Sequence, residues 1–386
     1  MELMNKKTST CAVSILVVLV VVSLINCGGG GSSNPQPTSH PETMYATGFN
    51  QILSFEVDSK TGGLSIPTST PGPNTDLAST ATIVANPAGK FLFVYDTAGE
   101  AIDVFSIDAA TRALTLVSGS PFPAGGLGGP GGLALDPSGK FLYVVAIFGI
   151  DAFTVNSSSG VLTPVLGSPF ADTNGPFGAV VVSTSRFLYA SDIGSGQATI
   201  SGFAVNASTG ALMPVPGSPF STASNGFPFF LMAHPSGKFL YAVIPATNSL
   251  AAWSVDSTTG ALTAVPGFPV VLKNGNSPFL SSIAIDPQGK FLYVSDGSGD
   301  IFGFTVNVNS GALTAMQGSP FSALAITDQL FFDPSGQFLY APAGTFIFAF
   351  SINSATGAPT LLNGLPFFAG SGLTLPATLT FVKAAP

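Results

Sequence analysis

The sequence predicts an all-β fold, a seven-bladed β-propeller made of four-stranded antiparallel blades. Three observations lead to this prediction. One unit recurs seven times, Gly, Pro and Phe are abundant while charged residues are scarce, and the C-terminus supplies the strand that the first unit lacks. Short strands that recur about every 48 residues are typical of radial blades, which protect one another's edges.

The composition of the 386-residue chain is that of a turn-rich β protein. It contains 45 Gly and 31 Pro, and 33 Phe are available to fill a core. Charged residues make up 8% of the chain, where roughly 25% is usual, and the formal net charge is −8. The scarcity of Glu excludes long helices, the 46% of hydrophobic residues excludes disorder, and the eleven basic residues are too few for a nucleic-acid partner.

The repeated unit is built around the sequence Lys-Phe-Leu-Tyr-Val or a variant of it. Its aromatic fourth residue, the anchor, stands at Tyr45, Phe93, Tyr143, Tyr189, Tyr241, Tyr293 and Tyr340. An apolar run precedes the anchor, a strand with a central aromatic follows it, and a fourth piece typically runs from Ala-Leu-Thr to Gly-Ser-Pro-Phe. All four pieces are short and bounded by turn residues, so each is predicted to be a strand.

Two turns recur within the unit. The first and second strands are joined by Asp-Pro-Ser-Gly or a relative, in which Pro fixes φ and the first side chain caps the turn. Between the third and fourth strands every unit has an Asp or Asn. Six of the seven then have a Gly four residues later, with Arg112 as the exception. This spacing predicts a hairpin that contains a Gly bulge.

The two ends of the repeat array complement each other. The first unit lacks its opening strand, and the segment from Pro376 to Val382 matches that strand just before the chain stops. We therefore expect the last strand to complete the first blade and to close the ring. A solenoid is the alternative, but it would leave this split unexplained.

The N-terminus has the pattern of an export signal. Lys6 and Lys7 precede an apolar run that ends at Ile25, which is too short for a spanning helix. The following Cys27 resembles the lipidated residue of a bacterial lipoprotein, and the alternative is a plain signal peptide. We expect residues 1–26 to be the signal, 27–42 a Gly/Ser/Pro-rich tether and 43–386 the propeller, anchored by lipid on the periplasmic or outer-membrane side of the cell envelope.

The repeated motifs make the chain similar to the seven-bladed β-propeller lactonase family. They are Asp-Pro-Ser-Gly-Lys-Phe-Leu-Tyr-Val, an aromatic-Ser-Val-Asp strand and Thr-Gly-Ala-Leu-Thr, and the resemblance covers residues 43–386. The family includes propeller-type 6-phosphogluconolactonases and carboxy-muconate cyclases. The resemblance implies a lactone substrate, held by Arg and His residues at the mouth of the central channel.

Those Arg and His positions are not matched in this sequence. The equivalent pairs are Ala81 and Thr82, Gly131 and Gly132, Phe177 and Gly178, Phe229 and Phe230, Ser281 and Ser282, Asp328 and Gln329, and Ala377 and Thr378. Lactone hydrolysis needs a base to activate water and a donor for the oxyanion. His234 and Arg112 fall in repeated turns and Arg186 takes a repeated solvent-side position, so we interpret all three as structural.

Residues that interrupt the repeat are the functional candidates. Asp96, Asp192 and Asp296 each follow an anchor by three residues, where strand two meets its loop to strand three. Loops that enter the next blade should share that face, and their polar residues are Asp172, Asn174, Asn225, Lys273, Asn274, Asn276, Asp328 and Gln329. The candidate catalytic residues are Asp96, Asp192, Asp296, Asp328 and Gln329, and the candidate Ca²⁺ ligands are Asp192 and Asp296. The alternative is a set of solvated loop acids and local turns.

Two functions remain open from the sequence. The favoured hypothesis is a non-catalytic propeller that binds a ligand or a protein at the cell envelope, and the alternative is a lactone-hydrolysing enzyme. The expected partner is a small-molecule lactone, a carbohydrate or an envelope protein. The membrane is contacted only through the lipid anchor, the protein is expected to be a monomer, and no cofactor is required apart from possible Ca²⁺.

Overall fold

The structure is a computed structural model of the chain. It describes residues 42–48, 50–72, 82–96, 99–125, 132–146, 149–172, 174–181, 186–193, 198–222, 226–273, 280–322, 329–362, 366–369 and 378–383, which belong to one compact unit. Within these residues no helix is both long and apolar enough to cross a membrane. The expected signal, Cys27, nearly all of the tether, and Asp328 lie outside the described residues.

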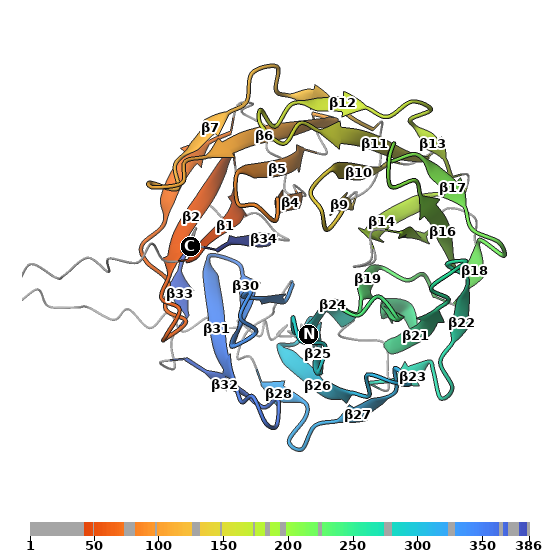
Figure 1. Cartoon of the computed structure of the whole chain (residues 1–386). Coiled ribbons are helices and arrows are strands. Elements are labelled where there is room, and N and C mark those ends of the chain that lie inside the picture. The colour runs from red at the N-terminus through yellow and green to blue at the C-terminus, as the bar shows by residue number, and fades with distance from the viewer. Residues whose placement is uncertain are drawn as a thin grey trace, which may run out of the picture. The chain divides into compact units, whose positions relative to one another are not determined.

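Seven antiparallel sheets form a ring of blades, numbered here in chain order (Figure 1). Blade 1 contains β34 (Leu379–Val382), β1 (Glu42–Gly48), β2 (Gln51–Val57) and β3 (Thr68–Pro71). Blade 2 contains β4 (Thr82–Ala85), β5 (Phe91–Asp96), β6 (Ala101–Ile107), β7 (Leu114–Leu116) and β8 (Phe122–Pro123). Blade 3 contains β9 (Leu133–Leu135), β10 (Phe141–Ala146), β11 (Gly149–Val155), β12 (Leu162–Pro164) and β13 (Phe170–Ala171). Blade 4 contains β14 (Pro176–Val181), β15 (Phe187–Asp192), β16 (Thr199–Val205), β17 (Leu212–Pro214) and β18 (Phe220–Ser221).

The remaining three blades repeat this pattern. Blade 5 contains β19 (Phe230–Ala233), β20 (Phe239–Ile244), β21 (Ser249–Val255), β22 (Leu262–Ala264) and β23 (Val270–Val271), with a 3-10 turn η1 (Pro245–Thr247). Blade 6 contains β24 (Leu280–Ile285), β25 (Phe291–Asp296), β26 (Asp300–Val306), β27 (Leu313–Ala315) and β28 (Phe321–Ser322). Blade 7 contains β29 (Phe331–Phe332), β30 (Phe338–Ala343), β31 (Phe346–Ile352), β32 (Pro359–Leu361) and β33 (Phe367–Phe368).

The ring closes as the sequence predicts. β34 pairs antiparallel with β1, with Thr43 opposite Val382 and Ala46 opposite Leu379. In Figure 1, β34 lies on the inner side of β1, in the place that β4 takes in blade 2. The last strand of the chain thereby covers the edge that the first blade would otherwise expose.

The fourth strand of blades 2 to 7 is divided in two. In blade 2, β7 and β8 both pair with β6, and the Gly-Ser-Pro turn between them contains a cis peptide at Pro121. The Ser120 hydroxyl accepts the Val104 N–H at 2.9 Å, so the side chain replaces a ladder partner at the break. The Gly-Ser-Pro-Phe motif therefore marks an interruption of the outer strand, not its end.

The core lies between neighbouring blades. The second strand of every blade is buried along almost its whole length, and its alternate residues pack on the blade before and the blade after. Six anchor tyrosines donate their hydroxyls to a carbonyl in the next blade's outer hairpin. The bonds run from Tyr45 to Arg112, Tyr143 to Gly210, Tyr189 to Gly260, Tyr241 to Gly311, Tyr293 to Gly357 and Tyr340 to Gly62. The seventh anchor is Phe93, which has no hydroxyl to donate to blade 3.

Arg112, the exception among the hairpin glycines, has the same left-handed backbone, with φ at 60°. At Gly210 a Cβ would stand 2.4 Å from the ring of Phe141, a residue of the preceding blade. The residue of blade 1 that corresponds to Phe141 is Thr43, which has no ring. A side chain is therefore tolerated at position 112 and not at its counterparts.

The strands define two ends of the propeller. We call the end where second strands run into third strands the upper face, and Asp96 and Ala101 mark it in blade 2. Connections from one blade to the next leave from the same end, because β8 pairs with the start of β6. The lower face holds the turns from first to second strand and from third to fourth strand.

Candidate functional site

The charged residues divide unequally between the two faces. Among the described residues, the upper face carries eight carboxylates, at Asp96, Glu100, Asp103, Asp151, Asp172, Asp192, Asp296 and Asp300, and one basic residue, Lys273. The other eight described basic residues lie at the lower face, together with eight acids. Over the described residues, the upper face therefore sums to a formal charge of −7 and the lower face to zero, which gives this part of the molecule an acidic end.

Several charged or polar side chains of the lower face form hydrogen bonds with the backbone of turns and hairpins. Asp136, Asp286 and Asp333 accept backbone N–H groups in the turns between first and second strands, as the sequence predicts. His234 takes the same place: its Nδ1 accepts the Ser236 N–H at 3.1 Å, and its Nε2 lies 2.9 Å from the Gly289 carbonyl of the next blade. Arg186 donates to the Ser257 carbonyl at 3.1 Å, in the outer hairpin of blade 5. The structural interpretation of these residues is confirmed.

In blade 4 the structure brings two of the predicted polar residues together with Asp192. This carboxylate is fully buried, and its Oδ2 accepts the hydroxyls of Thr199 at 2.7 Å and Ser201 at 3.0 Å. Asp172 arrives from the end of blade 3, and its Oδ1 accepts the Asn174 side-chain amide at 3.2 Å. The same amide donates to Ser201 at 3.3 Å and so joins the two carboxylates in one network.

Each carboxylate of this network keeps one unsatisfied oxygen. Among the described residues, Asp192 Oδ1 and Asp172 Oδ2 are buried without a hydrogen-bond partner. Burial, together with the charge of Asp172, raises the pKa of Asp192 to about 7, against the opposing bonds from Thr199 and Ser201. The site therefore has the chemistry of a carboxylate pair that lacks a counter-charge.

Blade 2 holds a second buried pair, Asp96 and Asp103. Asp103 is 1% exposed, and neither of its oxygens has a hydrogen-bond partner in the described part of the chain. Burial raises its pKa to about 6, and the charge of Asp96 adds to the effect. Across the next junction, Asp151 of blade 3 accepts the Gly125 N–H, and burial raises its pKa as well.

Blade 6 presents the contrasting arrangement around Asp296. The Lys273 ammonium donates to Asp296 Oδ2 at 2.7 Å and lies 3.6 Å from an oxygen of Asp300. Asp296 Oδ1 accepts the Ser298 N–H, the Ser298 hydroxyl and the Asp300 N–H. Burial opposes ionisation of Asp296, but the bonds from Lys273, Ser298 and Asp300 outweigh it and hold its pKa below the ordinary value.

The sequence candidates thus have different surroundings. Ser201 links Asp192 to Asn174, which in turn bonds to Asp172, and Lys273 forms an ion pair with Asp296. The loops and the strand ends therefore share a face, as predicted. Gln329 is half-buried at the entrance to blade 7, whereas Asp328, Asn225, Asn274 and Asn276 lie outside the described residues. In the described part of the chain, no three His, Cys, Asp or Glu side chains gather as a metal site would require.

Most of the described positions that correspond to the family's Arg and His pairs carry aromatic or hydroxyl groups, and the others are glycines and Gln329. Phe177 and Phe229 meet edge to face with ring centroids 5.0 Å apart, and Phe229 is 36% exposed. Ser281 Oγ lies 3.1 Å from Ser295 Oγ, and Ser282 accepts the Leu330 N–H at 3.0 Å. Phe177 follows Pro176, the residue that pairs with Asp192, and its partner Phe229 precedes the first strand of blade 5.

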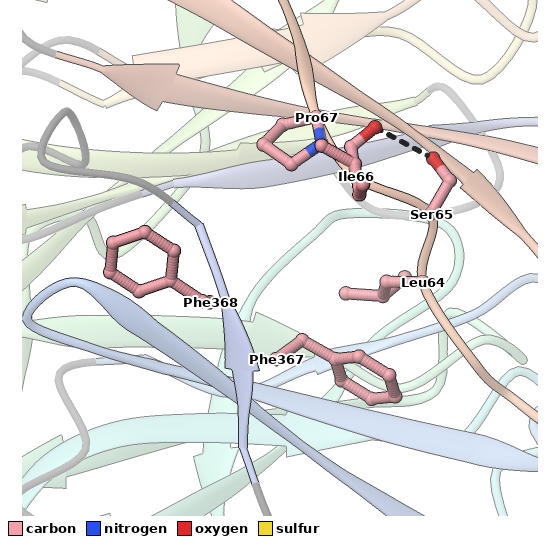
Figure 2. Close-up of a pocket in the computed structure, with 6 residues that line it drawn as sticks. All are labelled: Leu64, Ser65, Ile66, Pro67, Phe367 and Phe368. Carbon is pink, nitrogen blue, oxygen red and sulfur yellow. Dashed lines mark hydrogen bonds between the residues drawn. The ribbon is translucent and has the colours of Figure 1, made fainter. Parts of the chain in front are cut away.

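An apolar pocket of about 430 Å³ lies at the outer rim, between blade 1 and β33 of blade 7. Its lining consists of Leu64, Ser65, Ile66, Pro67, Phe367 and Phe368, and Figure 2 shows Phe367 and Leu64 facing each other across it. The Ser65 hydroxyl already donates to the Ile66 carbonyl and accepts the Glu56 N–H. With no titratable group in its lining, this pocket offers no acid–base chemistry.

Sequence reasoning missed Asp103 and Asp151. Both occupy the third position of a third strand, where other blades have Leu53, Ser201, Ala251, Phe302 and Phe348. An acid in place of these mostly apolar residues was the available signal. The repeat motifs do not include this position.

Fold and site together define a seven-bladed propeller, closed by its C-terminal strand, with a polar, acidic face at one end of the ring. The chain belongs to the family described as lactonase, 7-bladed beta-propeller, whose pattern matches residues 49–173 and 179–366. No curated protein matches its sequence.

Several solved structures share the fold. A putative 6-phosphogluconolactonase from Bacteroides fragilis is 20% identical with a TM-score of 0.69, over 91% of this chain and 100% of that one. The periplasmic gluconolactonase of Pseudomonas aeruginosa is 15% identical with a TM-score of 0.70, over 89% of this chain and 99% of that one. At these identities the likeness establishes the fold and leaves the activity to be argued from the site.

Proposed function

We propose that this protein is an exported, lipid-anchored propeller of the bacterial cell envelope that binds a small uncharged or cationic ligand at its upper face without converting it. The separation of charge carries the proposal. The described Arg and His side chains lie at the lower face, and the one basic residue described at the upper face, Lys273, is paired with Asp296. An anionic sugar lactone would meet carboxylates there and no free cation.

The ligand class follows from the groups that the upper face offers. Carboxylate oxygens accept hydrogen bonds from hydroxyl or ammonium groups, and the partly exposed pair of Phe177 and Phe229 offers an apolar surface at the same face. Isothermal titration calorimetry against neutral saccharides, alkylamines and anionic sugar lactones tests this. Binding from either of the first two classes supports the proposal, and exclusive binding of the anionic lactone overturns it.

The envelope location rests on the N-terminal pattern. Lys6, Lys7 and the apolar run to Ile25 precede Cys27, which would carry the lipid. Fractionation of cells that express the wild type or Cys27→Ser tests the anchor. Release of the processed variant into the soluble envelope fraction is expected, and continued retention in the membrane fraction would contradict it.

Lactone hydrolysis is the second candidate, and two observations favour it. The chain belongs to a lactonase family, and Asp192, with a pKa near 7, titrates where a general base must. Acid release from a panel of lactones should equal the buffer rate if the protein only binds. A rate above buffer that Asp192→Asn abolishes would replace the binding proposal with the enzyme.

A further inference from the structure

Blades 4 and 6 place equivalent carboxylates at the upper face, and only one of them has a cation. Asp192 ends β15 and Asp296 ends β25, each three residues after its anchor tyrosine. In both blades one carboxylate oxygen is satisfied locally, by hydroxyls at Asp192 and by hydroxyl and backbone groups at Asp296. The other oxygen receives the Lys273 ammonium in blade 6, and in blade 4 it has no partner among the described residues.

The lysine comes from a fixed place in the repeat. Lys273 follows β23 by two residues, and the residue at the same distance after β13 is Thr173, which carries no charge. The residue before it changes as well: Leu272 at the blade 6 junction corresponds to Asp172 at the blade 4 junction. Compared with blade 6, blade 4 therefore lacks the lysine and has a second carboxylate at this junction.

We propose that the blade 4 acidic site, formed by Asp172, Asn174, Asp192, Thr199 and Ser201, binds a small molecule through a primary ammonium group. The inference rests on the proposed ligand-binding function and names its ligand class. An ammonium carries three N–H donors, two of which would satisfy Asp192 Oδ1 and Asp172 Oδ2. Charge-assisted bonds of this kind are about twice as strong as neutral ones.

The surroundings specify the rest of the ligand. The Phe177 and Phe229 rings pack together at the same face, where blade 4 meets blade 5, and offer an apolar surface to the alkyl or alicyclic body of a ligand. The Lys273 side chain is 27% exposed, so the side chain that brings the ammonium to Asp296 in blade 6 lies partly at the surface. A quaternary ammonium lacks N–H donors, and a guanidinium would leave most of its five donors unmatched.

The test is calorimetric titration of the full-length protein with n-butylammonium chloride, with tetramethylammonium and Ca²⁺ as competing probes. We expect one site for n-butylammonium, at least tenfold weaker binding of tetramethylammonium, and at least tenfold weaker n-butylammonium binding in Asp192→Asn. Thr173→Lys, which places a lysine at the repeat position of Lys273, should also abolish n-butylammonium binding and keeps Asp192 in place.

Lys273→Ala is the matched control, because it should create a second n-butylammonium site in blade 6 and raise the stoichiometry from one to two. Binding that survives both Asp192→Asn and Thr173→Lys overturns the inference. So does equal affinity for tetramethylammonium, binding of Ca²⁺ alone, or no n-butylammonium binding at all. If saccharides still bind in that last case, the proposed function stands and only the ligand class is wrong.

Discussion

Blades 4 and 6 differ in the charge that meets the end of their second strand. Asp192 and Asp296 are both buried to 0% exposure at the same point of the repeat. A carboxylate neighbour, Asp172, helps to raise the pKa of the first, and an ammonium neighbour, Lys273, helps to lower that of the second. The fold therefore fixes where the carboxylate lies, and the residues that enter from the preceding blade decide whether it is ionised.

The largest expected change in stability comes from replacing Asp192 by a side chain that cannot ionise. Its ordinary pKa is 3.8 and the folded protein raises it to about 7, so the folded state binds more protons between these values. Stability should fall as pH rises from 4 to 7, by up to about 4 kcal/mol. Asp192→Asn keeps an acceptor for Thr199 and Ser201, and it should exceed the wild type by this amount at pH 8 and match it near pH 4.

Urea unfolding across this pH range measures the difference. Asp296→Asn is the control with the opposite sign, because the stability from a lowered pKa is present above the ordinary value and lost as pH falls. It should therefore be less stable than the wild type at pH 7. Parallel pH profiles for the two variants would show that the blades do not differ as described.

Blade 2 extends the comparison to Asp103, a carboxylate whose two oxygens have no hydrogen-bond partner among the described residues. Burial raises the pKa of Asp103 to about 6, so its ionisation costs roughly 3 kcal/mol at pH 8. Asp103→Leu places at this position the residue type that Leu53 provides in blade 1, and it should raise the urea midpoint at pH 8. Asp108→Leu, which removes a turn cap on the same blade, should lower that midpoint. A loss of stability in Asp103→Leu would mean that the carboxylate has a partner.

Most of the fold can be predicted from the sequence, because the same pattern of strands and turns recurs seven times. Each anchor strand, turn and aromatic position repeats, so the blade count and the closure by residues near Val382 follow without any long-range information. The candidate site can be predicted from the sequence only in part. That Asp192 and Asp172 share a face follows from strand direction, but their proximity depends on the path of connections whose lengths differ between blades. The pairing of Lys273 with Asp296 is one such outcome, and the burial of Asp103 another.

A smaller effect is expected from the ion pair of blade 6. Lys273→Met leaves Asp296 buried beside Asp300 with no ammonium, while the thioether retains most of the aliphatic contact. Because the lysine is partly exposed, the expected loss is about 1 to 2 kcal/mol at pH 7 in chemical denaturation. The loss should vanish at acidic pH, where Asp296 is protonated. A loss that is independent of pH would assign the effect to packing instead of charge.

The smallest change in stability is expected at the junction of blades 2 and 3, where the anchor residue Phe93 cannot form the inter-blade hydrogen bond. Phe93→Tyr places a hydroxyl where six other anchors have one, aimed at the Gly160 carbonyl that corresponds to Gly210. A bond of this type contributes about 1 kcal/mol, so the variant should be more stable by that amount in urea unfolding. Tyr189→Phe, which removes the 2.7 Å bond to Gly260, should lose a similar amount. If Phe93→Tyr instead destabilises the protein, the blade 2 junction is packed too closely for the oxygen, and the seven junctions are not equivalent.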